Sequence, residues 1–207
     1  WLNLGDSFMD KSMVGIPWRV AFALQADGWY LRSDIIWDKP NPMPEPVTDR
    51  PTKSHEYIFL LTKSKKYYYD ADAIKEPAIH HGKIVKATGG NSKNANSGFT
   101  SQYKRGFTTN DNHIGDKRNK RSVWTITKKP YKGAHFATFP EELPETCIKA
   151  GTKRGDVVLD IFAGSGTTLR VASRLGRKGI GIELNGEYLK LARKRCRIDS
   201  ESLLKYV

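Results

Sequence analysis

A glycine-rich turn that follows a short apolar run is the feature of this sequence best suited to bind a ligand. The apolar run of VVLDIFAGSGTT (157–168) ends at Asp160. The turn contains Gly164 and Gly166, which let the backbone approach a ligand closely, and the helical pattern that follows presents free N–H groups. Glu183 ends the next apolar run 23 residues after Asp160, close to the spacing of about 20 at which an acidic residue binds ribose hydroxyls. The pattern predicts a site for a cofactor that contains ribose.

The spacing of the glycines also limits which cofactor fits. A glycine turn alone is common in any α/β protein, but strand, turn, helix, second strand and terminal glutamate together favour a cofactor site. Thr168 or Leu169 stands near the place of the third glycine of a dinucleotide-binding turn, so this turn is poorly suited to bind a pyrophosphate. The GxxxxGK[ST] pattern of a P-loop is absent. A ligand without phosphates therefore fits better.

The elements that position this turn are expected to alternate between strands and helices. Apolar residues at helical spacing, with glycines at several ends, predict helices at 16–28, 139–151, 166–176 and 185–196. Short apolar runs predict strands at 1–4, 29–37, 55–64, 156–162 and 178–184. The last two strands and the helix between them form a βαβ unit, which predicts a parallel sheet.

Composition narrows the class of partner. The 207 residues carry a formal net charge of +13, which favours a polyanion such as nucleic acid or an anionic membrane surface. No apolar run approaches the roughly 20 residues that a spanning helix needs, and the first residues lack a signal-peptide pattern. We expect neither a secreted nor a membrane-embedded protein. Because the chain opens on Trp1 in a strand-like pattern, we also expect a fragment or an incomplete chain.

The cysteines and histidines predict no metal site. Cys147 and Cys196 are too few for a disulfide framework or a four-thiolate zinc site, and the five histidines show no ligand-like spacing with them. We interpret both cysteines as reduced core residues. His55 and Glu56 are neighbours on an expected strand and point to opposite faces, so we interpret them as structural polar residues rather than an acid–base pair.

A basic segment separates two structured parts of the chain. Between residues 75 and 132 there are thirteen lysines and arginines and three acidic residues, so most of the net charge lies here. The same stretch contains the tract GGNSKNANSG, whose composition predicts a mobile loop. We interpret residues 74–132 as an insertion.

These segments resemble a known family. DIFAGSGTT followed by GIELNGEYLKLARKR is similar to the S-adenosylmethionine site of the DNA methyltransferases that methylate adenine N6 or cytosine N4. WYLRSDIIWDKPNPMP and RPTKSHEYIFLLTKS resemble segments of the family's target-base half, and they precede the insertion while the glycine turn follows it. This order is that of the family's β group.

The resemblance implies a fold and a division into parts. The expected fold class is α/β, a three-layer Rossmann-like methyltransferase fold with a mixed, mostly parallel sheet, a circularly permuted motif order and a basic target-recognition insertion. Residues 1–73 would form the target-base half, 74–132 the target-recognition insertion and 133–207 the half that binds S-adenosylmethionine.

The resemblance also assigns residues to the methyl donor. Thr167 would lie near the methionine carboxylate and Glu183 would hold the ribose. The full expected set is Asp160, Phe162, Ala163, Gly164, Ser165, Gly166, Thr167 and Glu183, with Thr138, Phe139, Pro140 and Asp6 as further members. Residues 138–140 fit a helix cap equally well, and a plain turn at the end of the first strand competes evenly for Asp6.

DNA contacts are expected from basic and polar residues. Lys39 and Asn41 would lie beside the substrate cleft, and residues of the insertion would neutralise phosphates, which supplies affinity rather than sequence reading. A solvated basic loop is the alternative for the insertion. The residues expected to bind DNA are Lys39, Asn41, Lys104, Arg105, Lys117, Arg118, Lys120 and Arg121.

One motif of the family is missing. The family's catalytic tetrapeptide, Asp, Asn or Ser followed by Pro-Pro and an aromatic residue, occurs nowhere in the 207 residues. In β-group order it precedes the first strand, so we expect the catalytic residues upstream of Trp1. The family's reaction is a direct methyl transfer to a flipped base and needs no covalent enzyme intermediate, so neither cysteine is required as a nucleophile.

The sequence therefore supports one main function and two alternatives. The main one is a site-specific DNA amino-methyltransferase of a restriction–modification type, with S-adenosylmethionine as cofactor and duplex DNA as partner. A non-catalytic DNA-binding subunit that works with an active partner is the first alternative, and an RNA methyltransferase is the second. We expect a cytoplasmic protein, nucleoid-associated if bacterial or phage, with no membrane partner. A homodimer and a partner subunit both stay open.

Overall fold

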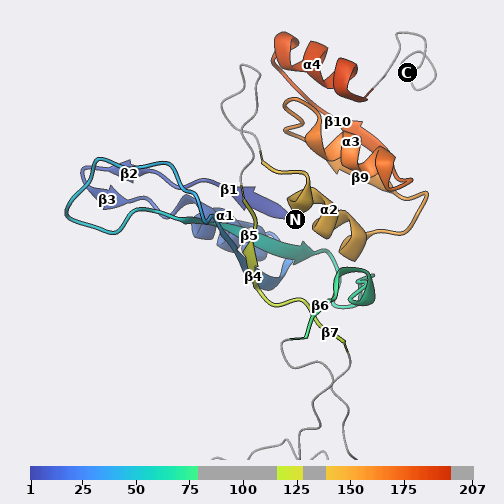
Figure 1. The fold of residues 1–207 in the computed structure, drawn as a ribbon, viewed down its shortest axis with the longest axis horizontal. Coiled ribbons are helices and arrows are strands. Elements are labelled where there is room, and N and C mark those ends of the chain that lie inside the picture. The colour runs from blue at the N-terminus through green and yellow to red at the C-terminus, as the bar shows by residue number, and fades with distance from the viewer. Residues whose placement is uncertain (79–115, 128–138, 197–207) are drawn as a thin grey trace, which may run out of the picture. The chain divides into compact units, whose positions relative to one another are not determined.

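The fold is described from a computed structural model, which describes residues 1–78, 116–127 and 139–196 (Figure 1). The chain divides into two compact units. The larger unit contains Trp1–Ile74 and Arg121–Val207, and the smaller one contains Lys75–Lys120. Of the described helices, none is long and apolar enough to cross a membrane.

A four-stranded sheet organises the N-terminal part of the larger unit. Its order is β1 (Leu2–Leu4), β5 (His55–Thr62), β4 (Tyr30–Asp38) and β8 (Val123–Thr125). The central strand β5 runs antiparallel to both β1 and β4, whereas β8 runs parallel to β4. The sheet core contains Ile35, Trp37, Ile58, Trp124 and Ile126.

The sheet is mixed, as predicted, but its pairing is less parallel than predicted. Two of the pairings in the four-stranded sheet are antiparallel. The physical reason lies in the connection between β4 and β5, residues 39–54, which contains no helix. A parallel neighbour requires a long crossover, usually helical, whereas a chain that turns back directly pairs antiparallel.

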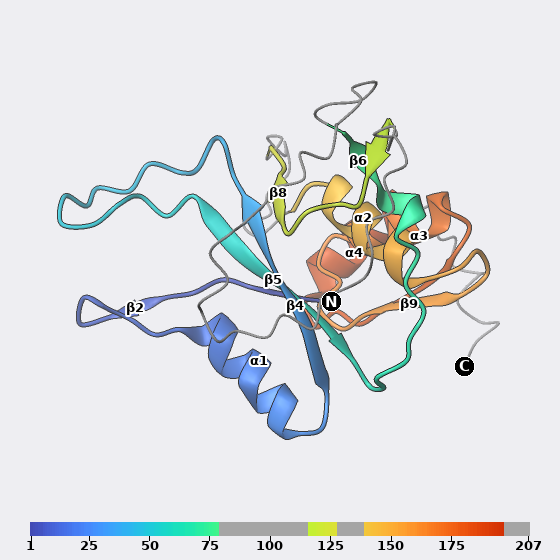
Figure 2. The ribbon, with the colours of Figure 1, turned by 90° about the horizontal axis from the view of Figure 1, so that it is seen from below.

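Helix α1 (Ile16–Ala26) lies beside β1 and β4 (Figure 2). Pro17 stands in its first turn, where the missing N–H costs nothing, and Gly15 precedes it in a left-handed conformation. Trp18 packs edge-on against Phe59 of β5, with ring centroids 4.9 Å apart. The helix predicted at residues 16–28 is therefore present and ends two residues early.

The C-terminal part has the predicted βαβα order. It runs through β9 (Val157–Asp160), α3 (Thr167–Arg174), β10 (Lys178–Gly181) and α4 (Gly186–Cys196). Strands β9 and β10 pair in parallel, with Val157 opposite Lys178. Gly181 gives α3 room, because a Cβ there would lie 2.6 Å from Leu169 Cδ1.

Helix α2 (Glu142–Gly151) takes part in both cores of the larger unit. Leu143 and Cys147, one turn apart, join the core of the four-stranded sheet. Ile148 packs with Val171 and Ala172 of α3 in a second core. The amphipathic helix therefore connects the sheet to the βαβα segment.

Several short elements were not predicted. Strands β2 (Phe8–Met9) and β3 (Ser12–Met13) form a hairpin whose turn residues, Asp10 and Lys11, have positive φ values without being glycine. A one-turn helix, η1, spans Asp72–Ile74. In the smaller unit, β6 (Glu76–Pro77) pairs antiparallel with β7 (Lys117–Arg118).

We expect Gly181→Ala to destabilise the fold. The added Cβ would lie 2.6 Å from Leu169 Cδ1, which can rotate away, and 2.9 Å from Ala163 Cβ, which cannot move without shifting the glycine turn. Overpacking of this kind costs about 1–3 kcal/mol in the free energy of unfolding, measurable by chemical denaturation. Gly186→Ala is the matched control, because a Cβ there meets nothing within 4 Å. Equal stability of the two variants would contradict the packing argument.

Candidate functional site

The glycine turn lies at the carboxyl end of β9 and leads directly into α3. Gly164 and Gly166 have φ values of 53° and 77°, in the left-handed region that favours glycine. Asp160 ends the strand, and its Oδ1 accepts a hydrogen bond of 3.0 Å from the Phe162 N–H. The Gly166 N–H in turn donates to the Ala163 carbonyl at 2.8 Å. We call residues 160–167 the donor loop.

Glu183 connects the end of β10 to the donor loop. Its Oε2 accepts a hydrogen bond of 2.7 Å from the Gly164 N–H, and its Oε1 accepts one of 2.8 Å from the Asn185 N–H. The structure therefore brings the predicted acid and the predicted glycine turn together. Each carboxylate oxygen has a second lone pair, so this side chain can also accept hydrogen bonds from a vicinal diol such as that of ribose.

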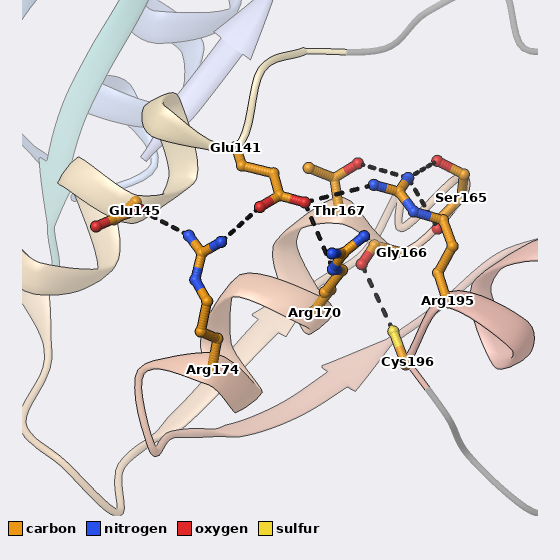
Figure 3. A network of polar contacts seen from close by, with 9 residues as sticks. All are labelled: Glu141, Glu145, Ser165, Gly166, Thr167, Arg170, Arg174, Arg195 and Cys196. Atoms are coloured by element: carbon orange, nitrogen blue, oxygen red, sulfur yellow. Dashed lines mark hydrogen bonds and ion pairs between the residues drawn. The ribbon is translucent and has the colours of Figure 1, made fainter. Parts of the chain in front are cut away.

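The side chains of the donor loop differ sharply in exposure. Phe162 is 80% exposed, whereas Ser165 and Thr167 are 3% and 6% exposed. The guanidinium of Arg195, in the last turn of α4, donates to Ser165 Oγ at 2.6 Å and to Thr167 Oγ1 at 3.1 Å (Figure 3). The loop thus combines one exposed aromatic ring with two buried hydroxyl groups.

The N-terminal end of α2 lies next to the donor loop. Glu141 is the residue before the helix, and its carboxylate accepts a hydrogen bond of 2.6 Å from Arg174 of α3. The same carboxylate lies 3.8 Å from the Arg195 guanidinium (Figure 3). Phe139 and Pro140 are half-buried just before Glu141, and Phe139 packs against the sheet core. Thr138 lies outside the described residues.

Asp6 lies at the end of β1 and holds the start of α1. Its Oδ1 accepts hydrogen bonds from the N–H groups of Ser7, Gly15 and Ile16 at 2.9, 2.9 and 3.0 Å. Desolvation raises the pKa of this carboxyl, but the backbone hydrogen bonds and the charge of Lys53 outweigh it and lower the pKa. These contacts correspond to the alternative interpretation, a strand-end turn. Contact between Asp6 and a cofactor stays a prediction.

Lys39 is engaged in a half-buried cluster at the end of β4. Its ammonium forms an ion pair with Glu56 and lies 4.6 Å from the ring centroid of Trp37. Glu56 Oε2 also accepts a hydrogen bond of 3.2 Å from the Asn3 side chain. Glu56 thus has polar partners within the sheet, and its interpretation as a structural polar residue stays a prediction. Asn41 is exposed on the loop after β4.

The basic residues of the insertion are only partly described. Arg118 donates to Glu76 Oε1 at 2.8 Å across the β6–β7 pair, and Lys117 is exposed. Arg121 is exposed and Lys120 half-buried. Lys104 and Arg105 lie outside the described residues. The role of all these residues in DNA binding stays a prediction.

The two thiols are poorly suited to nucleophilic chemistry. Burial raises the pKa of Cys147 to about 12, and burial also raises the pKa of Cys196. Both therefore stay protonated near neutral pH, and the thiolate is the reactive form. Within the part of the chain that the structure describes, no group of His, Cys, Asp and Glu side chains could hold a metal ion.

Comparison with protein-family models shows which family this chain belongs to. The family model described as DNA methylase matches residues 1–194. The chain belongs to the DNA methylase family. The resemblance to the β group of DNA amino-methyltransferases, inferred from the donor loop and the segment order, is thereby confirmed.

Two Type II methyltransferases match almost the whole chain. The Type II methyltransferase M.Cfr9I of Citrobacter freundii is 47% identical over 97% of this chain and 55% of its own length. The Type II methyltransferase M.SmaI of Serratia marcescens is 44% identical over 94% of this chain and 66% of its own length. The chain thus spans 55% of the length of the first relative and 66% of the length of the second.

A solved structure has a similar fold. The crystal structure of the M1.HpyAVI–SAM complex matches with a TM-score of 0.58 and 26% identity, over 87% of this chain and 68% of that chain. The α/β, Rossmann-like methyltransferase fold predicted from the sequence is confirmed.

Two residues of this site were not found from the sequence. Arg195 stands in the basic string ARKRC and Glu141 in FPEEL, where charged residues are ordinary helix-surface residues. Arg195 joins α4 to the donor loop, and Glu141 joins the start of α2 to arginines of α3 and α4, across sequence distances of 28 residues or more. No local pattern announces such contacts, because they depend on how three helices pack.

We expect Cys147 to resist alkylation in the folded protein. Its side chain is almost fully buried and its pKa is about 12, so iodoacetamide at pH 8 should modify Cys196 first and Cys147 only after unfolding. Peptide mass spectrometry with and without denaturant measures both rates. Modification of native Cys147 at the rate of a free thiol would contradict its place in the core.

Proposed function

We propose that this chain provides the methyl-donor site and the target-base half of a site-specific DNA amino-methyltransferase. The enzyme would transfer a methyl group from S-adenosylmethionine to adenine N6 or cytosine N4 of a flipped base in duplex DNA. The observation that carries the proposal is the hydrogen bond from Gly164 to Glu183, which joins the glycine turn and the strand-end acid in a chain of the DNA methylase family. The names of the relatives, Type II methyltransferases, support a restriction–modification role.

The residues at the donor loop fit S-adenosylmethionine. The Glu183 carboxylate is an acceptor suited to the ribose diol, and the exposed Phe162 ring offers an apolar surface to an adenine. Ser165 and Thr167 offer hydroxyls to the methionine carboxylate. The donor loop contains no lysine or arginine of its own, in keeping with a ligand that lacks phosphates.

The reaction requires this chain to orient the reactants, not to form a covalent intermediate with them. The donor supplies an electrophilic methyl group on a positively charged sulfur. An exocyclic amine is a poor nucleophile because its lone pair is delocalised into the ring, so the amine and the methyl group must be held in line. The donor loop would fix one of the two partners, and the thiols, kept protonated by burial, would take no part.

The groups that hold the target amine would come from a segment outside the 207 residues. The Pro-Pro-aromatic motif is absent from the sequence. One face of the β9–β10 pair carries Leu159 and Ile180, which lie opposite each other, and Ile161 and Ile182 follow just after the two strands. Each of these four side chains is between 51% and 57% exposed, although parallel sheets are normally covered on both faces. In the described residues β9 pairs with β10 alone. A segment bearing the motif could cover this face and pair with the open edge of β9.

Duplex DNA is the proposed partner of the whole protein. The net charge of +13 supports a polyanionic partner, and the exposed side chain of Lys117 could contact phosphates. We propose that residues 74–132 recognise the target sequence. Such an enzyme would act where DNA lies, in the cytoplasm and on the nucleoid of a bacterial cell.

We expect Glu183→Ala to weaken donor binding by about 10- to 100-fold, because a hydrogen bond to a charged group is lost. Titration calorimetry with S-adenosylmethionine measures the change. Glu187→Ala is the matched control, because it removes the same charge from the exposed first turn of α4. Unchanged affinity in Glu183→Ala would refute the ribose role.

A transfer assay tests the whole function. The product of the full coding sequence should move tritiated methyl groups to duplex DNA but not to RNA of equal length, at matched salt. Donor and DNA binding without transfer would favour the non-catalytic subunit, and transfer to RNA alone would overturn the DNA proposal.

We expect a cysteine at position 159 to report the covering segment. Leu159 is 57% exposed, so Leu159→Cys should react readily with a maleimide in the 207-residue chain. In the product of the full coding sequence the same cysteine should be protected at least about tenfold, as for a core residue. Equal reaction rates, read site by site with mass spectrometry, would show that no segment covers this face.

A further inference from the structure

The Arg195 side chain lies between the two hydroxyl groups of the donor loop and the carboxylate of Glu141. Its Nη1 atom donates to Ser165 Oγ at 2.6 Å and to Thr167 Oγ1 at 3.1 Å, and also lies 3.4 Å from the Ser165 carbonyl oxygen (Figure 3). Its Nη2 atom faces Glu141 Oε1 at 3.8 Å. The side chain is 17% exposed, so these contacts are largely shielded from water.

The arginine sets the direction of both hydroxyl groups. Arginine can only donate hydrogen bonds, so Ser165 and Thr167 must accept from it. Each hydroxyl then keeps its own proton to donate elsewhere. Among the described residues neither hydroxyl donates a hydrogen bond, and both are more than nine-tenths buried. A buried donor without an acceptor is costly, so the pair is prepared for an acceptor group.

The charges around Arg195 indicate an anionic acceptor. Glu141 is engaged more closely with Arg174, at 2.6 Å, than with Arg195, at 3.8 Å. Glu141 also lies 3.5 Å from Arg170. One carboxylate thus faces three guanidinium groups. The Arg195 guanidinium donates to side chains of the donor loop, whereas Arg170 contacts the loop through its backbone N–H, which donates to the Gly166 carbonyl at 3.0 Å. A ligand carboxylate beside Ser165 and Thr167 would lie next to the positive charge of Arg195.

We propose that Arg195 is a positioning residue for the carboxylate of the methyl donor. It acts through Ser165 and Thr167, whose hydroxyls it turns into donors, and it adds a positive charge behind them. The inference rests on the proposed function. It assigns the two ends of the donor to one βαβα segment, with Glu183 holding the ribose and Arg195 orienting the groups that hold the carboxylate.

Packing alone does not account for this contact. α4 is already seated on the loop, because a Cβ at Gly166 would lie 3.0 Å from Ala192 Cβ and 3.2 Å from Cys196 Sγ. The Cys196 thiol also contacts the Gly166 carbonyl at 3.6 Å. A variant at position 195 should therefore keep the helix in place, which makes a selective loss measurable.

Two ligands separate a role in the carboxylate subsite from a general structural role. S-Adenosylhomocysteine carries the adenosine, the sulfur and the amino-acid carboxylate, whereas 5′-methylthioadenosine lacks the amino-acid part. Calorimetry would compare both ligands on the unchanged protein and on Arg195→Gln, Arg195→Lys and Arg193→Gln. Arg193 is exposed on the same turn of α4 and supplies the matched change of charge.

Arg195→Gln should bind S-adenosylhomocysteine about 10- to 100-fold more weakly, while its affinity for 5′-methylthioadenosine changes less than about threefold. Arg195→Lys should recover part of the loss, because it restores the charge without the planar fork. Arg193→Gln should match the unchanged protein. Equal losses for both ligands, or no loss for either, would overturn the role of Arg195.

Failure of the proposed function would look different. If the unchanged protein binds neither ligand, the donor site itself is refuted and the inference falls with it. If Glu183→Ala weakens both ligands while Arg195→Gln weakens neither, the donor site stands and only the role of Arg195 is lost.

Discussion

The packing of α2 on two sides is the constraint on which the rest of the larger unit depends. Leu143 and Cys147 bury one side of the helix in the core of the four-stranded sheet, and Ile148 buries another against α3. In the described residues no strand pairing joins that sheet to β9 and β10. The position of the donor loop relative to the sheet therefore depends on α2, and the ion pairs of Glu141 with the arginines of α3 reinforce that packing.

Two charged side chains hold the donor loop, one as a hydrogen-bond acceptor and the other as a hydrogen-bond donor. Its backbone N–H at Gly164 requires an acceptor and receives the Glu183 carboxylate, whereas the hydroxyls of Ser165 and Thr167 receive the Arg195 guanidinium. Left-handed glycines alone would leave such a loop with much conformational freedom. Fixing it from both sides before a ligand arrives reduces the ordering cost of binding. The same contacts that stabilise the loop therefore also prepare it chemically.

Local patterns predicted most regular elements, and long-range pairing explains what they missed. The βαβα segment and α1 were predicted within a few residues, because glycines and apolar periodicity mark their ends. The β2–β3 hairpin was missed because its turn uses Asp10 and Lys11 in place of glycine. The antiparallel pairing of β5 depends on a helix-free connection. At the site, Glu183 could be predicted from its spacing, whereas Arg195 could be found only from the packing of α4.

The formal net charge overstates the number of cations available to DNA. Lys39 is paired with a glutamate of β5, Arg118 with one of β6, and Arg174 with two at the N-terminal end of α2, Glu141 and Glu145. Counterion release, the main source of affinity for DNA, depends on cations that reach phosphates. A paired cation must first give up its carboxylate, and a buried one must also be moved. The basic residues of this chain therefore fall into two groups. Those with carboxylate partners stabilise the fold and the donor site. Exposed ones such as Lys117 can contact a polyanion.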